Sequence, residues 1–594
     1  MRNLALQCCW VSWLTAGLVV SGCSDSCRDT LQRSARMNDA AAAQGSTGTM
    51  APAVRTQTKP PTVPLGLNLG AINYYGPTLP FVDVMKNADA PQTTPAQGGQ
   101  WSSELIDKVP LDAAGWPLEV PYSGPGVSQP QWVRYSVVGL TYPGRYTLMY
   151  DGDGEFEFPA APVQVVDRAP GVWHLDVQKS DSPLFLTITR SAKQNHVRNV
   201  RLILPGFEAD YARQVFHPRF LEDVRGATVL RFMDWQHTND SELARWSDRA
   251  TPEMTQGTAR GAAFETMLDL SNRLGADPWL CIPHKADDDF VEQLAKLVRD
   301  RLGPERVVYI EYSNELWNGI FGQAHYVEEQ GCKAGFNKLE PYRGSCDDPG
   351  VKMWAGTKWA AKRTARIFEI FERVFGGTSR LVRVVAGQSA WMERNEIQLK
   401  AFNSPILNPR RVRADALAIA PYFGAVADQL TEKYGGSGFS VDTILQKMDD
   451  SIDSDVRDAT RQNKALAERF GLRLIAYEGG QHLVAGGEHQ NDEALTAKLI
   501  AANRNQRMAK LYEKMFAAWY AESGRDLLVL FNSADMPSKY GSWGLLETQD
   551  QQSEQAPKYR AFREQLVRLV LTRGSKDSAP APSPAEPRKP TPNR

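Results

Sequence analysis

Two glutamates occupy positions in this sequence where acid–base chemistry is expected. Residues 307–318 read Val-Val-Tyr-Ile-Glu-Tyr-Ser-Asn-Glu-Leu-Trp-Asn, an apolar run that becomes polar at Asn314 and Glu315. A second run, residues 472–480, ends in Tyr-Glu-Gly-Gly and places Glu478 at the corresponding point. A carboxyl group at the end of a buried strand can exchange a proton with a glycosidic oxygen, while a neighbouring amide holds a sugar hydroxyl. The sequence therefore predicts two carboxyl groups that act on one substrate.

The elements that would position these glutamates are strands of a parallel sheet. Apolar runs alternate with amphipathic stretches along most of the chain, which is typical of an α/β fold. Eight such βα units close a TIM (β/α)8 barrel, in which chemistry is found at the carboxyl ends of the strands. Helices are expected at residues 217–224, 262–274, 289–302, 358–375, 456–470 and 495–522. Strands are expected at residues 65–73, 227–235, 278–284, 307–315, 383–390, 415–423, 472–480 and 526–534.

The βα pattern is interrupted between the first and second expected strands. Residues 97–205 carry short alternating runs separated by Gly and Pro, which predicts an inserted antiparallel β module. The barrel itself would comprise residues 65–96 and 206–572. Two roles fit the module equally well, namely glycan binding or a packing and spacer function.

Both ends of the chain have the composition of segments outside a folded domain. Residues 1–23 combine Arg2, an apolar run and a terminal Val-Ser-Gly-Cys, which predicts an export signal. The last four of these residues resemble a bacterial lipobox, so we expect Cys23 to carry lipid. A plain secretory signal is the next alternative, and a retained membrane anchor is the last. Residues 24–64 would form a flexible tether and residues 573–594 a disordered Pro-rich tail. We expect a cell-envelope protein on the outer membrane, facing the periplasm or the exterior.

Composition narrows the possible partners. The chain of 594 residues has 68 basic and 69 acidic residues, so no net field attracts a polyanion, and nucleic acid is not an expected partner. Its 15 Trp and 19 Tyr residues offer flat faces on which a neutral sugar ring can stack. No Cys or His spacing suggests a metal site, and no cofactor is expected. Cys332 and Cys346 flank one loop and are candidates for a disulfide in an exported protein, whereas Cys281 lies within an apolar strand.

The positions of the two glutamates resemble those of the clan A glycoside hydrolases. In these barrels the acid/base follows an Asn at the end of strand four, and the nucleophile ends strand seven. The resemblance implies retaining hydrolysis of a β-linked polysaccharide or oligosaccharide, with Glu315 as acid/base, Asn314 as its sugar-binding neighbour and Glu478 as nucleophile. Arg231 resembles the second-strand Arg that keeps the nucleophile ionised; the alternative is a salt bridge that closes the barrel.

Other residues extend the resemblance with less specificity. His284 and Tyr422 end the third and sixth expected strands and resemble hydrogen-bonding partners of the pocket, although a core role fits each nearly as well. His482, near Glu478, is a weaker candidate for a supporting group. Many clan members carry a Trp at the end of strand eight, where this chain has Phe531 and Asn532. The tryptophans expected to stack on sugar are Trp235, Trp317, Trp391 and Trp543, the last as a replacement for the strand-eight residue.

Two rival interpretations remain beside the enzyme. One is a glycan-binding surface lipoprotein whose barrel has lost turnover, and the other is an anchoring lipoprotein with a structural barrel. Only the enzyme requires both Glu315 and Glu478, and the chain has both.

Overall fold

The structure is a computed structural model that describes residues 63–577 except 140–141, 161–162, 181 and 436–437. The predicted signal peptide, Cys23 and nearly all of the predicted tether lie outside the described residues. In the described part of the chain, no helix is long and apolar enough to cross a membrane.

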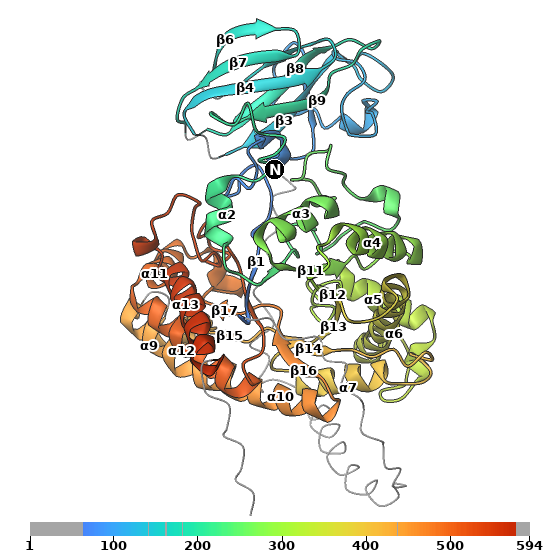
Figure 1. Cartoon of the computed structure of the whole chain (residues 1–594), viewed down its shortest axis with the longest axis vertical. Coiled ribbons are helices and arrows are strands. Elements are labelled where there is room, and N and C mark those ends of the chain that lie inside the picture. Colours follow the sequence, from blue (N-terminus) through green and yellow to red (C-terminus); the bar gives the residue numbers. More distant parts are fainter. Residues whose placement is uncertain (1–62, 140–141, 161–162, 181, 436–437, 578–594) are drawn as a thin grey trace, which may run out of the picture.

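The predicted barrel is confirmed: eight parallel strands close into a ring (Figure 1). Each lies within or next to a predicted run, but the hydrogen-bonded ladders are shorter than the runs. The polar residues that end the runs lie in loops beyond the ladders. In ring order the strands are β1 (Leu65–Asn68), β10 (Val229–Arg231), β11 (Asp277–Ile282), β12 (Val308–Tyr312), β13 (Leu381–Ala386), β14 (Ala416–Ile419), β16 (Arg473–Ala476) and β18 (Leu528–Leu530).

Helices surround the barrel (Figure 1). They include all of the predicted ones, although the predicted helix at residues 495–522 is divided into two, and the one at 456–470 begins with the π-helical turn η6 (Asp453–Asp458). The last helix continues to Asp577, beyond the predicted start of the tail at residue 573, and residues 578–594 are not described. The helices are α2 (Pro218–Val224), α3 (Phe264–Leu274), α4 (Asp288–Arg301), α5 (Gly322–Lys333), α6 (Pro349–Phe375), α7 (Met392–Phe402), α8 (Ala427–Tyr434), α9 (Val441–Ile452), α10 (Ala459–Arg469), α11 (Glu493–Arg504), α12 (Arg507–Ser523) and α13 (Pro557–Asp577).

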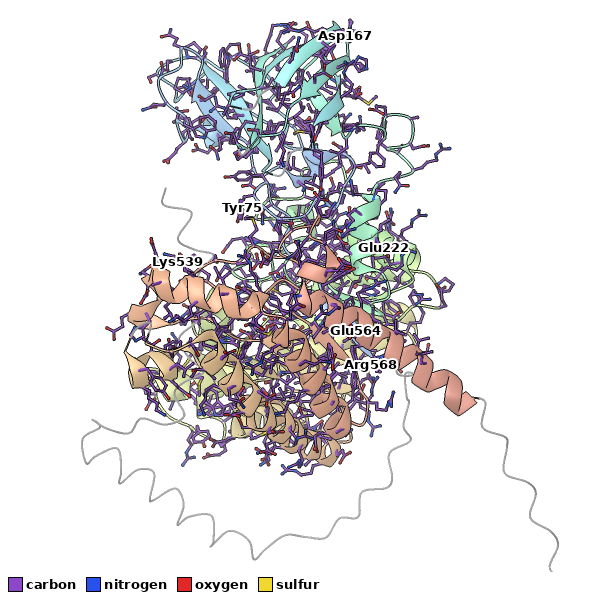
Figure 2. All side chains as sticks on the ribbon, turned by 90° about the vertical axis from the view of Figure 1, so that its left-hand side faces the viewer. Tyr75, Asp167, Glu222, Lys539, Glu564 and Arg568 are labelled. Carbon is purple, nitrogen blue, oxygen red and sulfur yellow. A yellow bond between two sulfur atoms is a disulfide. The ribbon has the colours of Figure 1, made fainter. Side chains whose placement is uncertain are left out.

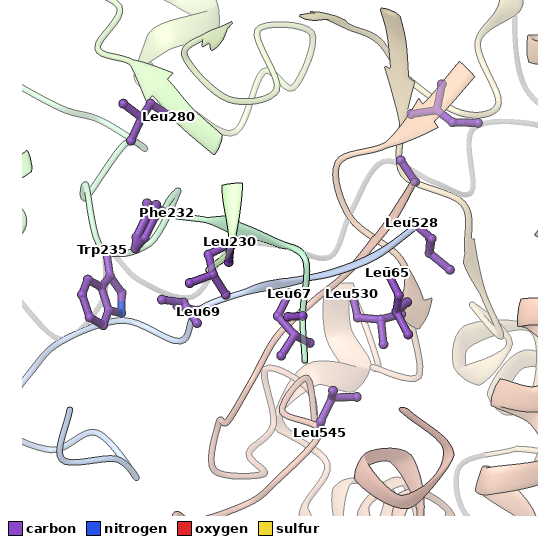
Figure 3. Packing of buried hydrophobic residues seen from close by; sticks show 14 of the residues in the cluster. Leu65, Leu67, Leu69, Leu230, Phe232, Trp235, Leu280, Leu528, Leu530 and Leu545 are labelled. Atoms are coloured by element: carbon purple, nitrogen blue, oxygen red, sulfur yellow. The ribbon is translucent and has the colours of Figure 1, made fainter. Parts of the chain in front are cut away.

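Side chains alternate between the two faces of the barrel wall. In β12, Val308 and Ile310 join the apolar layer between strands and helices, while Tyr309 belongs to the cluster that fills the barrel. Figure 3 shows the outer layer near β1, where leucines from neighbouring strands pack together. A strand side-chain period of two residues places Glu311 on the same inner side as Tyr309. A buried carboxylate therefore lies inside the barrel, below the end of β12.

The inserted β module is also present, between β1 and α2. It has its own apolar core and lies beyond one end of the barrel (Figure 1). Because the insertion occupies the connection after β1, it belongs to the face where the strands end. One sheet has the order β2 (Gln92–Pro95), β3 (Gln131–Val138), β8 (Leu184–Ser191), β5 (Gly154–Glu157), and the other β6 (Val163–Ala169), β7 (Val172–Val177), β4 (Gly144–Asp151), β9 (Arg198–Ile203).

Candidate active site

Arg231, at the end of β10, is the centre of a buried network at the mouth of the barrel. Its Nη1 donates to Glu478 Oε1 at 2.7 Å and to Asn68 Oδ1 at 3.1 Å. Its Nη2 donates to Glu311 Oε2 at 3.0 Å and to Asn314 Oδ1 at 2.8 Å. The guanidinium thus links strands one, two, four and seven. Arg231 therefore contacts Glu478 and also bridges strands of the barrel, and its role toward a nucleophile stays a prediction.

Glu478 follows β16 and is fully buried. Beyond β16 the chain forms β17 (Gly480–Gln481), which pairs with β15 (Tyr422–Phe423), and this pairing brings Tyr422 beside Glu478. The Tyr422 hydroxyl donates to Glu478 Oε2 at 3.0 Å, so each carboxylate oxygen accepts a hydrogen bond. Burial raises the pKa of Glu478, whereas Arg231 and Tyr422 act in the opposite direction by favouring the ionised form.

Glu315 lies three residues beyond β12, and among the described residues none of its hydrogen-bond partners is a cation. Asn318 Nδ2 donates to its Oε2 at 3.0 Å, and the Tyr477 hydroxyl lies 3.3 Å from its Oε1. Burial, followed by the negative charge of Glu478, raises the pKa of Glu315 to about 8. At neutral pH Glu315 is therefore protonated, while Glu478 is the better stabilised anion.

The backbone is strained where it presents Glu315. Ser313 and Glu315 both have positive φ, at 58° and 43°, a region that residues with a side chain rarely adopt. Each such residue costs on the order of 1–3 kcal/mol, and residues of this kind cluster at active sites. Their burial and hydrogen bonds, including the Ser313 N–H to Ile282 bond, hold this conformation.

Glu311 is a further member of the site that we did not predict. Its Oε2 accepts hydrogen bonds from Arg231, from Trp279 Nε1 at 2.8 Å and from the Cys281 thiol at 3.5 Å. Its Oε1 has no hydrogen-bond partner among the described residues. Arg231 is therefore shared between two buried carboxylates. The available signal was a charged residue in the middle of an apolar strand, which requires a buried partner.

Asn314 and His284 are held by other contacts. The Asn314 amide oxygen accepts from Arg231, and its Nδ2 donates to Asn239 Oδ1 at 3.1 Å. The His284 ring packs edge-on against Tyr326, and its Nδ1 has no partner in the described part of the chain. Burial lowers the pKa of His284 to about 4, so the ring is neutral. Neither prediction of substrate contact is tested by these interactions, and both stay predictions.

Trp235, which we predicted to stack on sugar, is buried in the structure. Its side chain is 1% exposed, its Nε1 donates to the Gly70 carbonyl, and its ring packs among Phe81, Phe220 and Phe232. The reason is that β10 ends at Arg231, and the chain then turns the indole toward the helical layer instead of the mouth.

The other three tryptophans have different surroundings. Trp543 packs edge-on against Tyr422, His482 and Phe531, so it reaches the end of strand eight from the following loop, as expected. Trp317 is half-buried, with no partner for its Nε1 among the described residues. Trp391, also half-buried, meets Trp354 edge-on.

The predicted disulfide is confirmed. Cys332, near the end of α5, is bonded to Cys346 in the loop before α6, with a Cα–Cα distance of 6.2 Å. Among the residues that the structure describes, no group of three or more His, Cys, Asp and Glu side chains is placed to hold a metal ion.

Comparisons with known proteins find similarity at the level of structure. No protein-family model matches the chain, and no curated protein sequence matches it. The GH51 arabinofuranosidase from Xanthomonas axonopodis pv. citri is 12% identical with a TM-score of 0.37; the match covers 59% of this chain and 66% of that one, just under two thirds of its length. The catalytic core of xylanase A is 13% identical with a TM-score of 0.34, over 59% of this chain and 92% of that chain. Native xylanase 10B from Thermotoga maritima is 13% identical with a TM-score of 0.31, over 59% of this chain and 90% of that chain. At such low similarity, function has to be inferred from the residues of the site.

Proposed function

We propose that this protein is a retaining glycoside hydrolase that cleaves a β-linked, largely neutral polysaccharide or oligosaccharide. The observation that carries the proposal is the unequal environment of two buried glutamates at one barrel mouth. Glu478 accepts hydrogen bonds from a guanidinium and a phenol, whereas Glu315 has neutral partners and a pKa raised to about 8. Two carboxyl groups whose pKa values are pushed apart by their surroundings have the properties of a nucleophile and a general acid.

In the first step Glu478 attacks the anomeric carbon while Glu315 protonates the departing glycosidic oxygen. The C–O bond to the leaving sugar breaks, and an ester between the sugar and Glu478 forms. Formation of the ester removes the negative charge of Glu478. Because that charge is one cause of the raised pKa of Glu315, the pKa of Glu315 falls in the intermediate.

In the second step the ionised Glu315 takes a proton from water, and the resulting oxygen nucleophile attacks the anomeric carbon. The ester bond breaks, Glu478 regains its charge, and Glu315 regains its proton. Two displacements at the same carbon give net retention of configuration. Arg231 and Tyr422 act throughout by stabilising Glu478 as it loses and regains charge.

The experiment that tests this function is hydrolysis of a panel of β-glucans, mannans and xylans by the purified domain. We expect at least one member to be cleaved, with a loss of roughly a hundredfold or more in rate for Glu315→Gln and for Glu478→Gln. The exposed Glu488 provides a matched control, since its conversion to glutamine should leave the rate unchanged. Glycan binding without any cleavage would instead support the second candidate, a non-catalytic glycan-binding surface protein.

We further propose that the protein works outside the cytoplasm, attached to a membrane through lipid on Cys23. The disulfide supports an oxidising compartment, because such bonds are rare in the cytosol. Expression of Cys23→Ser in the native host should release the protein into the soluble fraction. Unchanged fractionation with membranes would refute the lipid anchor.

A further inference from the structure

A cavity lies where the β module joins the barrel. It measures about 150 Å³ and is lined by residues from the loops after β1 and β10, among them Tyr75, Asp89, Asp234 and His237. This volume holds roughly five water molecules, since each occupies about 30 Å³ in the liquid, or a single sugar ring. The cavity is therefore large enough for one residue of a glycan.

One carboxyl group of the lining lies within electrostatic range of the catalytic pair. Burial, followed by the charge of Glu478, raises the pKa of Asp234 to about 7, so the two carboxyl groups are electrostatic neighbours. Burial also raises the pKa of Asp89 to about 6, and its carboxyl group accepts the backbone N–H of Tyr74. No Lys or Arg is among the described residues that line the cavity. The lining therefore offers Asp89 and Asp234 no direct Lys or Arg partner that would compete with sugar hydroxyls.

An aromatic strip runs from this cavity onto the β module; we define it as Tyr75, Tyr74, Phe185 and Trp101. The ring of Tyr74 meets Tyr75 edge-on at 5.2 Å and Phe185 at 6.4 Å, and Phe185 meets Trp101 edge-on at 4.8 Å. Figure 2 places Tyr75 at the level where the module meets the barrel. The strip therefore joins residues from the loop after β1 to residues of the module.

The two ends of the strip are exposed, although their positions are fixed. Tyr75 is 47% exposed and Trp101 is 50% exposed, whereas Phe185 between them is buried. The guanidinium of Arg134 lies 4.1 Å from the centre of the Trp101 ring and donates to the Trp101 carbonyl at 3.0 Å. An exposed aromatic ring that is already held in place loses little conformational freedom when a ligand stacks on it.

Attachment of the module to the barrel does not explain this exposure. Backbone hydrogen bonds already join the two parts, from Gly139 to the Tyr74 carbonyl and from Asp89 to the Ser136 carbonyl. Rings that served only to pack the two parts together would be buried, as Phe185 is.

We propose that the glycan-binding site extends from the barrel onto the β module, with one sugar residue in the cavity and further residues of the same chain stacked on Tyr75 and Trp101. This inference rests on the proposed function, because it assumes that the substrate is a glycan. It assigns a binding role to the module and predicts a preference for long substrates.

The test compares Tyr75→Ala, Trp101→Ala and the double variant with Tyr434→Ala, which removes an equally exposed tyrosine outside the strip. The first readout is kcat/KM on a long β-glycan divided by kcat/KM on a short aryl β-glycoside. Loss of one stacking ring should lower this ratio roughly three- to tenfold, mainly through KM on the long chain. The Tyr434→Ala ratio should match that of the wild type.

The second readout is affinity electrophoresis in gels that contain mixed-linkage β-glucan, glucomannan or xylan, with Glu478→Gln as the parent. Strip variants should migrate faster than the parent in the gel that retards it. If the double variant keeps both the wild-type ratio and the retardation, the inference is wrong while the proposed function stands. If nothing is cleaved but strip variants lose retardation, the proposed function fails and the aromatic surface stands. If the parent is not retarded in any gel although glycosides are cleaved, the strip is not a glycan site.

Discussion

Replacement of Glu315 by glutamine should make the folded protein more stable at neutral pH while it abolishes the acid function. Glutamine resembles the protonated form of Glu315 in shape and charge. Its amide oxygen can accept from Asn318 Nδ2 as the carboxyl oxygen does, and its amide N–H can donate to the Tyr477 hydroxyl, which in the wild type donates to Glu315 Oε1. The variant therefore keeps the contacts of the neutral side chain and removes its ability to ionise.

The size of the effect follows from the difference in pKa between the folded and unfolded states. The Glu315 pKa rises from 4.5 to about 8 on folding. At pH 7 the unfolded chain is almost fully ionised at this position and the folded chain mostly is not, so folding requires uptake of a proton. Because of this proton uptake, the free energy of unfolding of the wild type at pH 7 is lower by roughly 3 kcal/mol than it would be with a side chain that does not ionise. This is an upper bound, because Glu478 titrates together with Glu315.

The sign of the pH dependence is fixed by the raised pKa. The stability of the wild type is fully retained below the unfolded value of 4.5 and is lost as pH rises toward the folded value of about 8. We therefore expect wild type and Glu315→Gln to have similar stability near pH 4.5, the unfolded pKa of Glu315. Above that pH, the free energy of unfolding of the variant should rise relative to that of the wild type by up to about 1.4 kcal/mol for each pH unit.

The assay is urea unfolding between about pH 5 and about pH 8, with midpoints compared at constant slope. Glu488→Gln, at a side chain that is 89% exposed, is the matched control and should follow the wild type throughout. A Glu315→Gln midpoint that is lower than that of the wild type at neutral pH would refute the reasoning. It would mean that Glu315 is ionised in the folded protein and that the two glutamates have been assigned in the wrong order.

Three further predictions concern the surroundings of the site. Arg231→Met leaves two buried carboxylates without their cation and should lower the free energy of unfolding by about 3–5 kcal/mol; an unchanged urea midpoint would contradict the network. Tyr422→Phe removes a donor that favours ionised Glu478, so the acid limb of the kcat/KM profile should move to higher pH, and a downward shift would count against this role. Serine at both Cys332 and Cys346 should reduce stability by about 3 kcal/mol, and two free thiols in the unreduced wild type would show that the bond is absent.

The barrel could be predicted because each strand appears in the sequence as a short apolar run that ends where polar residues return. The parallel ladders are buried on both faces, so they appear in the sequence as continuous apolar stretches. The exact ends could not be predicted, because apolar residues continue past the last ladder hydrogen bond. Phe232 and Trp235, for example, follow β10 and belong to the outer apolar layer. The strand that we predicted to end at Trp235 therefore ends at Arg231.

Much of the site could be predicted from the residues at strand ends, but the hydrogen bonds between those side chains could not. Glu315, Glu478 and Tyr422 were found because polarity returns at the end of an apolar run. Glu311 was missed because its role depends on Arg231, which lies 80 residues earlier in the chain. Hydrogen bonds between distant strands become visible only when the barrel closes.

The central claim is that Glu478 is the nucleophile of a retaining mechanism, and a 2-fluoro glycoside trap tests it most directly. Slow turnover of the trapped ester should allow mass spectrometry of a digest to find the label on Glu478, and NMR should show that the first-formed product keeps the β configuration. An inverted first product, or a label on Glu315 or any other residue, would contradict the account.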